Sequence, residues 1–326
     1  MTAPLAIGID IGGTKIAAGL VDRAGLVGGL EVVPTDADAG GSVVLERALA
    51  LGRSVVERVP GPAGASAIGI AAGGWIDAGS GRVVGATALL PGWAGIDLRA
   101  AFERELGIPA TAVNDVQAMG VAEARLGAGR ECGVCLCVAV GTGIGGAITV
   151  DGRLFRGARG FAGAIGHIGW SSSGPQCSCG RRGCIEAEAS GPAIARAFDA
   201  CLRRGALRGL KGTGPSGLPD VVLALQSPGE GAHACALDVT ATAGTRLGRV
   251  LGGLANALDP DVIIVGGGAA VALGDHFLAA IRAGVAEGVL VHIKPAVVRS
   301  GLGGSASVVG AGLLALDAVN GTTGHP

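Results

Sequence analysis

The sequence lacks an excess of charge of either sign. Its 25 lysine and arginine residues are balanced by 26 aspartate and glutamate residues, which gives a formal net charge of -1. No long run of like charges occurs, whereas proteins that bind nucleic acids or anionic membranes usually carry a basic cluster. We therefore expect neither nucleic acid nor a membrane as a partner.

A long uninterrupted apolar segment is also missing, although 49% of the residues are hydrophobic. Residues 132–150 are uncharged, but the glycines of residues 141–146 divide this stretch into two short runs rich in β-branched residues. Such runs predict buried strands joined by a turn rather than a membrane helix. The N-terminal residues show none of the regions of a secretion signal, so we expect a cytoplasmic protein.

Glycine, by contrast, is abundant. It makes up 63 of the 326 residues, which is about 19% compared with about 7% in average proteins. Paired glycines therefore arise by chance, and a glycine motif indicates a site only where its strand, its polar residues and its position in the chain also fit.

The order of the expected strands and helices repeats once along the chain. Residues 5–10, 16–21 and 27–33 predict three consecutive strands, and residues 134–140 and 147–150 predict a second hairpin of the same kind. Alternating helices and strands follow in both halves. This pattern predicts two similar α/β domains with a ligand-binding cleft between them.

Both hairpins turn through glycines that stand beside polar residues. The residues concerned are Asp10, Gly12, Gly13, Thr14 and Lys15 in the first turn and Gly141, Thr142, Gly143 and Gly145 in the second. Backbone N–H groups in such turns can converge on an anion, and hydroxyl and ammonium groups add donors. An ordinary hairpin explains the first turn equally well, because its spacing matches neither a Walker loop nor a dinucleotide fingerprint. Two such turns in repeated domains indicate a polyphosphate ligand.

Asn114 and Asp115 stand where a predicted strand ends and a predicted helix begins. An aspartate at this place most often caps the helix. It can also accept the proton of an attacking hydroxyl, as phosphoryl transfer to an alcohol requires. The residues alone leave both roles of Asp115 open.

One histidine and three cysteines follow in the pattern H-x9-C-x-C-x4-C. They are His167, Cys177, Cys179 and Cys184. One imidazole and three thiolates complete the tetrahedral ligand set of Zn²⁺ and leave no position open for water. The pattern predicts a structural zinc site, with free thiols as the alternative.

The other five cysteines lie in apolar segments. We expect them to be small buried residues rather than ligands; they are Cys132, Cys135, Cys137, Cys201 and Cys235.

These motifs together resemble the ROK family (repressor, open reading frame, kinase) of the actin/hexokinase-like superfamily. The resemblance covers nearly the whole chain, through DIGGTK (10–15), VND (113–115), GTGIGG (141–146), GH (166–167), CSCGRRGCIEAEASG (177–191) and VGGG (265–268). The zinc segment is its most specific part. ROK repressors carry a winged helix before the first phosphate turn, which here starts at residue 10, so the resemblance favours the kinase branch.

The resemblance implies a two-domain, actin-like (ribonuclease H-like) α/β kinase fold with an interdomain cleft. The first domain would comprise residues 1–115 and 305–326, and the second would comprise residues 116–304 with the zinc loop 167–184. The implied reaction is ATP-dependent phosphorylation of a primary hydroxyl on a hexose or hexose-like ring, with Mg²⁺ accompanying ATP. The family also commonly forms homodimers.

The resemblance also assigns roles to individual residues. Asp115 would be the catalytic base, and Asn114, Glu186 and Gly74 would contact the sugar. His167 would bind zinc through one ring nitrogen and the sugar through the other. The two glycine turns would hold the phosphates of ATP, with adenosine near Gly266, Gly267 and Gly268.

Two positions depart from the family pattern. Ala164 replaces the glutamate of GEIGH, and Leu89 replaces the asparagine of N-L-P-G-W. Losing a charged hydrogen-bond partner costs about 1.5–3 kcal/mol, or roughly ten- to a hundredfold in affinity. Three alternatives follow: a weakened glucokinase, a kinase for a modified sugar or a sugar-like cyclitol, and a sugar-sensing protein without turnover. Polyphosphate also stays open as a donor.

Overall fold

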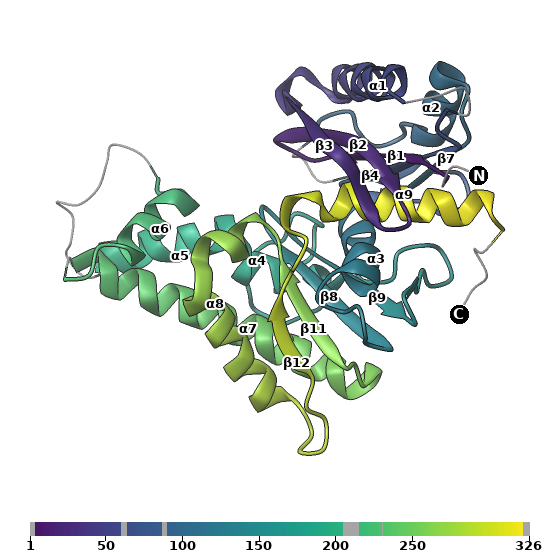
Figure 1. Cartoon of the computed structure of the whole chain (residues 1–326). Coiled ribbons are helices and arrows are strands. Elements are labelled where there is room, and N and C mark those ends of the chain that lie inside the picture. The colour runs from purple at the N-terminus through teal and green to yellow at the C-terminus, as the bar shows by residue number, and fades with distance from the viewer. Residues whose placement is uncertain (1–3, 60–63, 87–89, 205–214, 230, 322–326) are drawn as a thin grey trace. The chain divides into compact units, whose positions relative to one another are not determined.

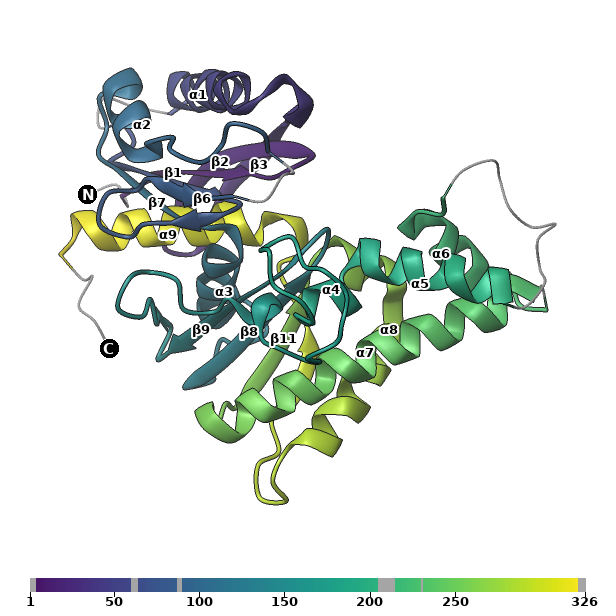
Figure 2. The ribbon, with the colours of Figure 1, turned by 180° about the vertical axis from the view of Figure 1, so that it is seen from behind.

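The computed structural model describes residues 4–59, 64–86, 90–204, 215–229 and 231–321. The chain divides into two compact units (Figures 1 and 2), one formed by Met1–Cys137, Ala147–Gly163 and Ser300–Pro326 and the other by Val138–Gly146 and Ala164–Arg299. The domain boundaries expected from the resemblance, at 115/116 and 304/305, differ from this division and stay a prediction.

The first five-stranded sheet lies wholly in the first unit. Its strands are β1 (Ala6–Ile11), β2 (Lys15–Asp22), β3 (Gly25–Pro34), β4 (Ala67–Ala72) and β7 (Ala110–Asn114), in the order β3-β2-β1-β4-β7. The first three strands are antiparallel neighbours, and β4 and β7 run parallel to β1. The short strands β5 (Trp75–Ile76) and β6 (Val83–Gly85) form a separate pair.

Helices cover both faces of the first sheet. Alternate residues of β1, Ile7 and Ile9 among them, pack with the apolar stripe of α1 (Gly41–Glu57) and with α2 (Leu98–Leu106). On the other face lies α9 (Ala306–Val319), as Figures 1 and 2 show. A Cβ at Gly8 or Gly69 would come within 2.1 or 1.9 Å of a carbonyl oxygen of α9. Glycine at these two strand positions therefore sets the close approach of the helix to the sheet.

The helix α3 (Asp115–Leu126) packs beside α9 in the same unit. A Cβ at Gly310 of α9 would lie 1.8 Å from the carbonyl oxygen of Ala118. Asp317 of α9 also accepts hydrogen bonds from Arg23 and from Arg125 of α3. Close backbone contact and the ion pair between Arg125 and Asp317 hold α3 and α9 together.

The second sheet repeats the strand order of the first. Its strands are β8 (Val134–Val140), β9 (Ile144–Val150), β10 (Arg153–Leu154), β11 (Val262–Gly266) and β12 (Ala296–Arg299), in the order β10-β9-β8-β11-β12. Counted along the chain within each sheet, both orders read third, second, first, fourth, fifth. The repeated α/β pattern and the strands expected within residues 132–150 are thus confirmed.

The helices of the second unit are α4 (Glu186–Ala189), α5 (Gly191–Arg204), α6 (Leu218–Leu225), α7 (Gly231–Leu258) and α8 (Gly268–Gly288). Short 3-10 turns occur at Ala37–Ala39, Ile165–His167 and Gly303–Ser305. Among the described residues, α8 is the one helix whose length and composition would allow it to cross a membrane. Half of its apolar stretch is buried, and it packs on α7 so closely that a Cβ at Gly248 would lie 2.2 Å from the carbonyl oxygen of Ile281. This packing is typical of a core helix.

The cysteines outside the zinc pattern divide into two groups. Cys135 and Cys137 are fully buried, as expected. Cys235 is also buried, whereas Cys132 is half-buried. Cys201 and Cys235 form a disulfide between α5 and α7, which was not expected. The sequence does not reveal this pairing, because the packing of the two helices brings the Cα atoms to 5.8 Å across a separation of 34 residues.

Removing the disulfide should destabilise the second unit. A cross-link that closes a loop of this length raises the free energy of unfolding by roughly 3–4 kcal/mol, because it restricts the unfolded chain. We expect the double variant Cys201→Ser/Cys235→Ser to unfold at lower denaturant than the wild type without reductant, and at equal denaturant with reductant. Cys132→Ser, which replaces a free cysteine, is the control. Titration of two additional thiols in the unfolded, unreduced wild type would contradict the bond.

Candidate functional site

Several predicted site residues of the first unit gather at one edge of its sheet. The strands β1, β4 and β7 are parallel, with Ile11 opposite Ala72 and Ala72 opposite Asn114. Their carboxyl ends therefore coincide. Asp10, Gly74 and Asp115 lie at or just beyond these ends, at the edge where parallel α/β sheets commonly bind ligands.

Asn114 fixes the geometry of this edge. Its side-chain oxygen accepts hydrogen bonds from the N–H groups of Val116 (3.0 Å) and Gln117 (3.3 Å), and its Nδ2 donates to the carbonyl of Gly74 (3.0 Å). Asn114 is therefore the N-cap of α3, so the capping role considered for Asp115 belongs to its neighbour. Asp115 occupies the first position of the helix.

A buried tryptophan supports the same edge. The indole Nε1 of Trp93 donates to the carbonyl of Gly73 at 3.0 Å, and Trp93 is completely buried. It thereby holds the loop that follows β4. No role was predicted for Trp93, which ends the segment L-P-G-W. Leu89, which precedes that segment, lies outside the described residues.

The electrostatic environment raises the pKa of both carboxyl groups at this edge. Burial is the main cause for Asp115, and hydrogen bonding from Val116 N–H partly offsets it. Burial and the charge of Asp115 raise the pKa of Asp10 to about 7, against a smaller lowering by Lys15. Within the described chain, Oδ1 of Asp10 is inaccessible to solvent and accepts no hydrogen bond. A cation bound beside these two carboxylates would relieve both effects.

The first glycine turn is held by hydrogen bonds from Thr35, and residues 13–15 of the turn are exposed to solvent. Thr35 donates its hydroxyl proton to the carbonyl of Gly12 (2.7 Å) and its backbone N–H to the carbonyl of Thr14 (3.1 Å). Gly13, Thr14 and Lys15 are exposed, so they are accessible to a ligand. Thr35 is buried, and no sequence motif pointed to it.

The second glycine turn is held within the second unit. The N–H of Gly141 donates to the carbonyl of Gly143, and the N–H of Gly191 at the start of α5 donates to the carbonyl of Gly141, both at 2.9 Å. A Cβ at Gly143 would lie 2.7 Å from Oε2 of Glu186. Glycine is therefore required at position 143 if Glu186 keeps its place.

The third glycine segment joins β11 to α8. Gly266 ends the strand and Gly268 begins the helix. Gly267 has φ +92°, and a Cβ there would come within 2.5 Å of the backbone N of Val140. The segment thus lies against the end of β8, just before the second glycine turn, and these two predicted nucleotide-binding segments are neighbours.

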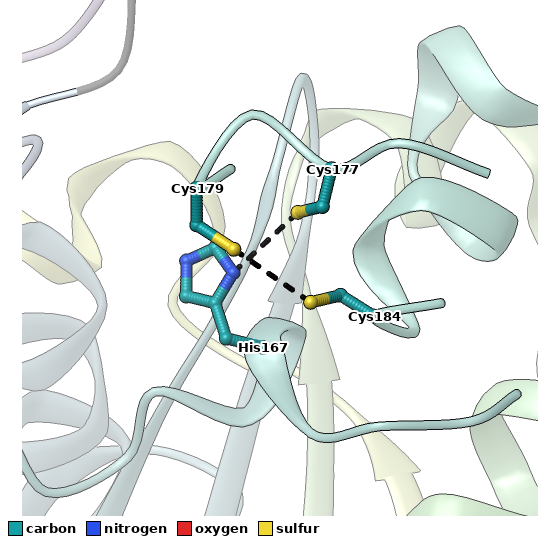
Figure 3. A group of neighbouring side chains, drawn as sticks. All are labelled: His167, Cys177, Cys179 and Cys184. Carbon is teal, nitrogen blue, oxygen red and sulfur yellow. Dashed lines mark hydrogen bonds between the residues drawn. The ribbon is translucent and has the colours of Figure 1, made fainter. Parts of the chain in front are cut away.

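The four predicted zinc ligands converge. Their ligand atoms all lie within 4.8 Å of one another, with 3.7 Å between Cys177 Sγ and His167 Nδ1 and 3.7 Å between the sulfurs of Cys179 and Cys184 (Figure 3). A tetrahedron with Zn–S bonds of about 2.3 Å has S···S edges of about 3.8 Å. The group therefore fits a tetrahedral metal ion.

Glu186 connects the zinc ligands to the second glycine turn. Its Oε1 accepts hydrogen bonds from Ser178 Oγ (2.9 Å) and Cys177 Sγ (3.5 Å), and its Oε2 accepts one from the N–H of Ile144 (2.9 Å). The resemblance assigned Glu186 to the sugar. In this structure the carboxylate joins two loops, a bridging role that the sequence did not reveal.

The predicted residues therefore form two groups. One lies at the edge of the first sheet, around Asp115, and the other lies in the second unit, around the zinc ligands and two glycine segments. Ala164 is exposed and directly precedes the 3-10 turn that carries His167.

Known proteins resemble this chain along most of its length. The model of the ROK family matches residues 6–318. A glucokinase of Halalkalibacterium halodurans is 31% identical, over 94% of this chain and 94% of that protein, and an N-acetylmannosamine kinase of Citrobacter koseri is 32% identical, over 95% and 98%. A ROK family glucokinase from Streptomyces griseus, solved in complex with glucose and AMPPNP, matches with a TM-score of 0.81 and 32% identity, over 96% and 99%. The chain belongs to the ROK family.

Proposed function

We propose that this chain is an ATP-dependent kinase that phosphorylates a primary hydroxyl of a hexose or hexose-like sugar. The observation that carries the proposal is the placement of Asp115 at the start of α3, where Asn114 provides the cap. Its carboxylate has a raised pKa, as suits a general base. The similarity to glucokinases over most of the chain supports the same activity.

In the proposed reaction, Asp115 accepts the proton of the sugar hydroxyl while that oxygen attacks the γ-phosphorus. The bond between this phosphorus and the bridging oxygen breaks, and ADP leaves. The glycine turns at 12–14 and 141–146 would hold the phosphate chain through their N–H groups, and Gly266–Gly268 would lie near the adenosine. Lys15 would add a positive charge beside the first turn.

Mg²⁺ is expected with ATP, because it neutralises the charge that develops on the transferred phosphoryl group. Asp10 fits the role of holding it, because its buried Oδ1 has no hydrogen-bond partner in the described chain. Zinc would be structural, held by His167, Cys177, Cys179 and Cys184. With Nδ1 of His167 facing the cysteines, Nε2 is the ring nitrogen that would face the sugar.

The identity of the sugar depends on Ala164. Glucose and a modified sugar or cyclitol are both candidates, because Ala164 has no acceptor for a sugar hydroxyl. The similarity to N-acetylmannosamine kinases favours including amino and N-acetyl sugars. An ADP-release assay over hexoses, amino, N-acetyl and deoxy sugars and cyclitols, with ATP or polyphosphate as donor, tests the proposal. A sensing protein would instead show sugar-dependent thermal stabilisation without ADP release.

The variant Ala164→Glu should raise kcat/KM for glucose roughly ten- to a hundredfold, because a carboxylate restores an acceptor for hydroxyl donors. The exposed position accommodates the larger side chain. Ala158→Glu, at another exposed alanine, controls for the added charge. Unchanged glucose kinetics in Ala164→Glu would show that residue 164 does not set specificity.

We further propose that the protein forms a homodimer, as the resemblance implies. We also propose that it is cytoplasmic. Sedimentation equilibrium of the purified protein tests the dimer, and cell fractionation tests the location. A monomer at assay concentration would contradict the first point.

A further inference from the structure

Two buried polar side chains of α3 have no role in the proposed reaction. Gln117 is 4% exposed and Glu123 is fully buried. Burying an amide or a carboxylate is costly unless its polar atoms are hydrogen-bonded. Both side chains find their partners in segments far along the chain.

Glu123 accepts four hydrogen bonds. One comes from the N–H of Ala128 (2.9 Å), and the other three come from Ser300 Oγ and the N–H groups of Gly301 (3.0 Å) and Leu302 (2.9 Å). Residues 300–302 directly follow Arg299, the last residue of the second unit. Glu123 therefore fixes the chain where it returns to the first unit.

Gln117 makes an equivalent attachment near another crossing, that is, a place where the chain passes from one unit to the other. Its Nε2 donates to the carbonyls of Gly160 and Ala162, both at 2.9 Å. These residues directly precede Gly163, after which the chain enters the second unit. Gly163 has φ +96°, a conformation that favours glycine.

The chain passes between the units at four places. Two of them, 137/138 and 146/147, fall inside the strands β8 and β9, where the backbone belongs to a sheet. The other two, 163/164 and 299/300, lie outside regular strands or at a strand end. Hinges are typically found at such loop or element-terminal positions. Both of these crossings are attached to α3, whose first residue is Asp115.

We propose that Gln117 and Glu123 are positioning residues, which fix the segments 160–162 and 300–302 to the helix that carries the catalytic base. Both attached segments are then held at a constant distance from Asp115, because both side chains and the base stand on one rigid helix. The inference rests on the proposed function of Asp115.

The test compares Glu123→Gln with Asp317→Asn in the full-length, zinc-loaded enzyme. In Glu123→Gln an NH₂ group replaces one of the two carboxylate oxygens, so the N–H of Gly301 or that of Leu302 loses its acceptor and should exchange its hydrogen faster. Misplacement of the base should lower kcat roughly ten- to a hundredfold, with the KM for ATP unchanged. Asp317 is a matched buried carboxylate that accepts hydrogen bonds from Arg23 and Arg125, and neither arginine lies where the chain passes between the units. Asp317→Asn should lower the melting temperature as much and leave kcat near the wild-type value.

A normal kcat in Glu123→Gln despite faster exchange, or an equal loss of kcat in Asp317→Asn, would overturn the inference. If Glu123→Gln does not fold, the variant Gln117→Leu tests the inference instead. We then expect faster amide hydrogen exchange at residues 160–164 and the same loss of kcat. If Asp115→Asn proves active, the proposed function fails separately. In that case the hydrogen-exchange data test only whether Glu123 holds residues 300–302. Unchanged protection of the amides of Gly301 and Leu302 in Glu123→Gln would contradict this attachment.

Discussion

Asp115→Asn should lower kcat for sugar phosphorylation by roughly 10²–10⁴-fold, the usual contribution of a positioned general base. The amide is nearly isosteric but cannot accept the hydroxyl proton. KM for ATP should stay near the wild-type value, because the glycine turns that would hold the phosphates are unchanged. Steady-state ADP release, with circular dichroism to verify folding, measures the effect.

Asp97→Asn is the matched control, because Asp97 caps α2 through a hydrogen bond from the N–H of Ala100 and asparagine caps equally well. It should retain full activity. Substantial turnover in Asp115→Asn would remove Asp115 as the base.

The raised pKa of Asp115 predicts the acid limb of the pH profile. The base must be ionised, so kcat/KM, which reports the free enzyme, falls as the pH falls through its pKa. Because burial raises this pKa above 3.8, the limb should lie at a higher pH than for an ordinary aspartate. A limb at or below 3.8 would contradict the proposed environment.

Loss of zinc should have the second large effect. We expect about one zinc ion per chain in the purified wild type and none in Cys179→Ser, because a hydroxyl is a poor substitute for a thiolate ligand. Without the ion, three closely spaced thiols and His167 lose their common partner, and the loop from which Ser178 donates its hydrogen bond to Glu186 loses its anchor. The kcat/KM for sugar should fall at least about tenfold, because disturbing the residues around a bound metal ion typically lowers activity by ten- to a hundredfold.

Elemental analysis, limited proteolysis within residues 167–184 and sugar kinetics measure these outcomes together. Cys132→Ser controls for the loss of a thiol. The proposed metal site would be refuted if the wild-type protein contains no zinc, or if Cys179→Ser contains one zinc ion per chain.

Much of the fold could be predicted from local sequence. The strand-turn-strand pattern at residues 5–21 and its repeat at 134–150 were predicted from short apolar runs and glycine turns, and both are present. The short strands β5 and β6 were not predicted, because two or three residues carry no periodicity. The disulfide between Cys201 and Cys235 was missed because it depends on how α5 packs against α7.

The sequence by itself determined the chemistry that nearby residues share. The four zinc ligands lie within 18 residues, and Asn114 and Asp115 are adjacent, so spacing alone predicts these groups. Only the tertiary structure decided that Asn114 caps α3, that Glu186 binds Ile144, and that Glu123 holds residues 300–302. The contacts of Glu186 and Glu123 depend on which distant backbone donors are buried beside a polar side chain. That pairing is set by the packing of whole helices and strands, because a buried polar group must find a partner wherever the fold provides one.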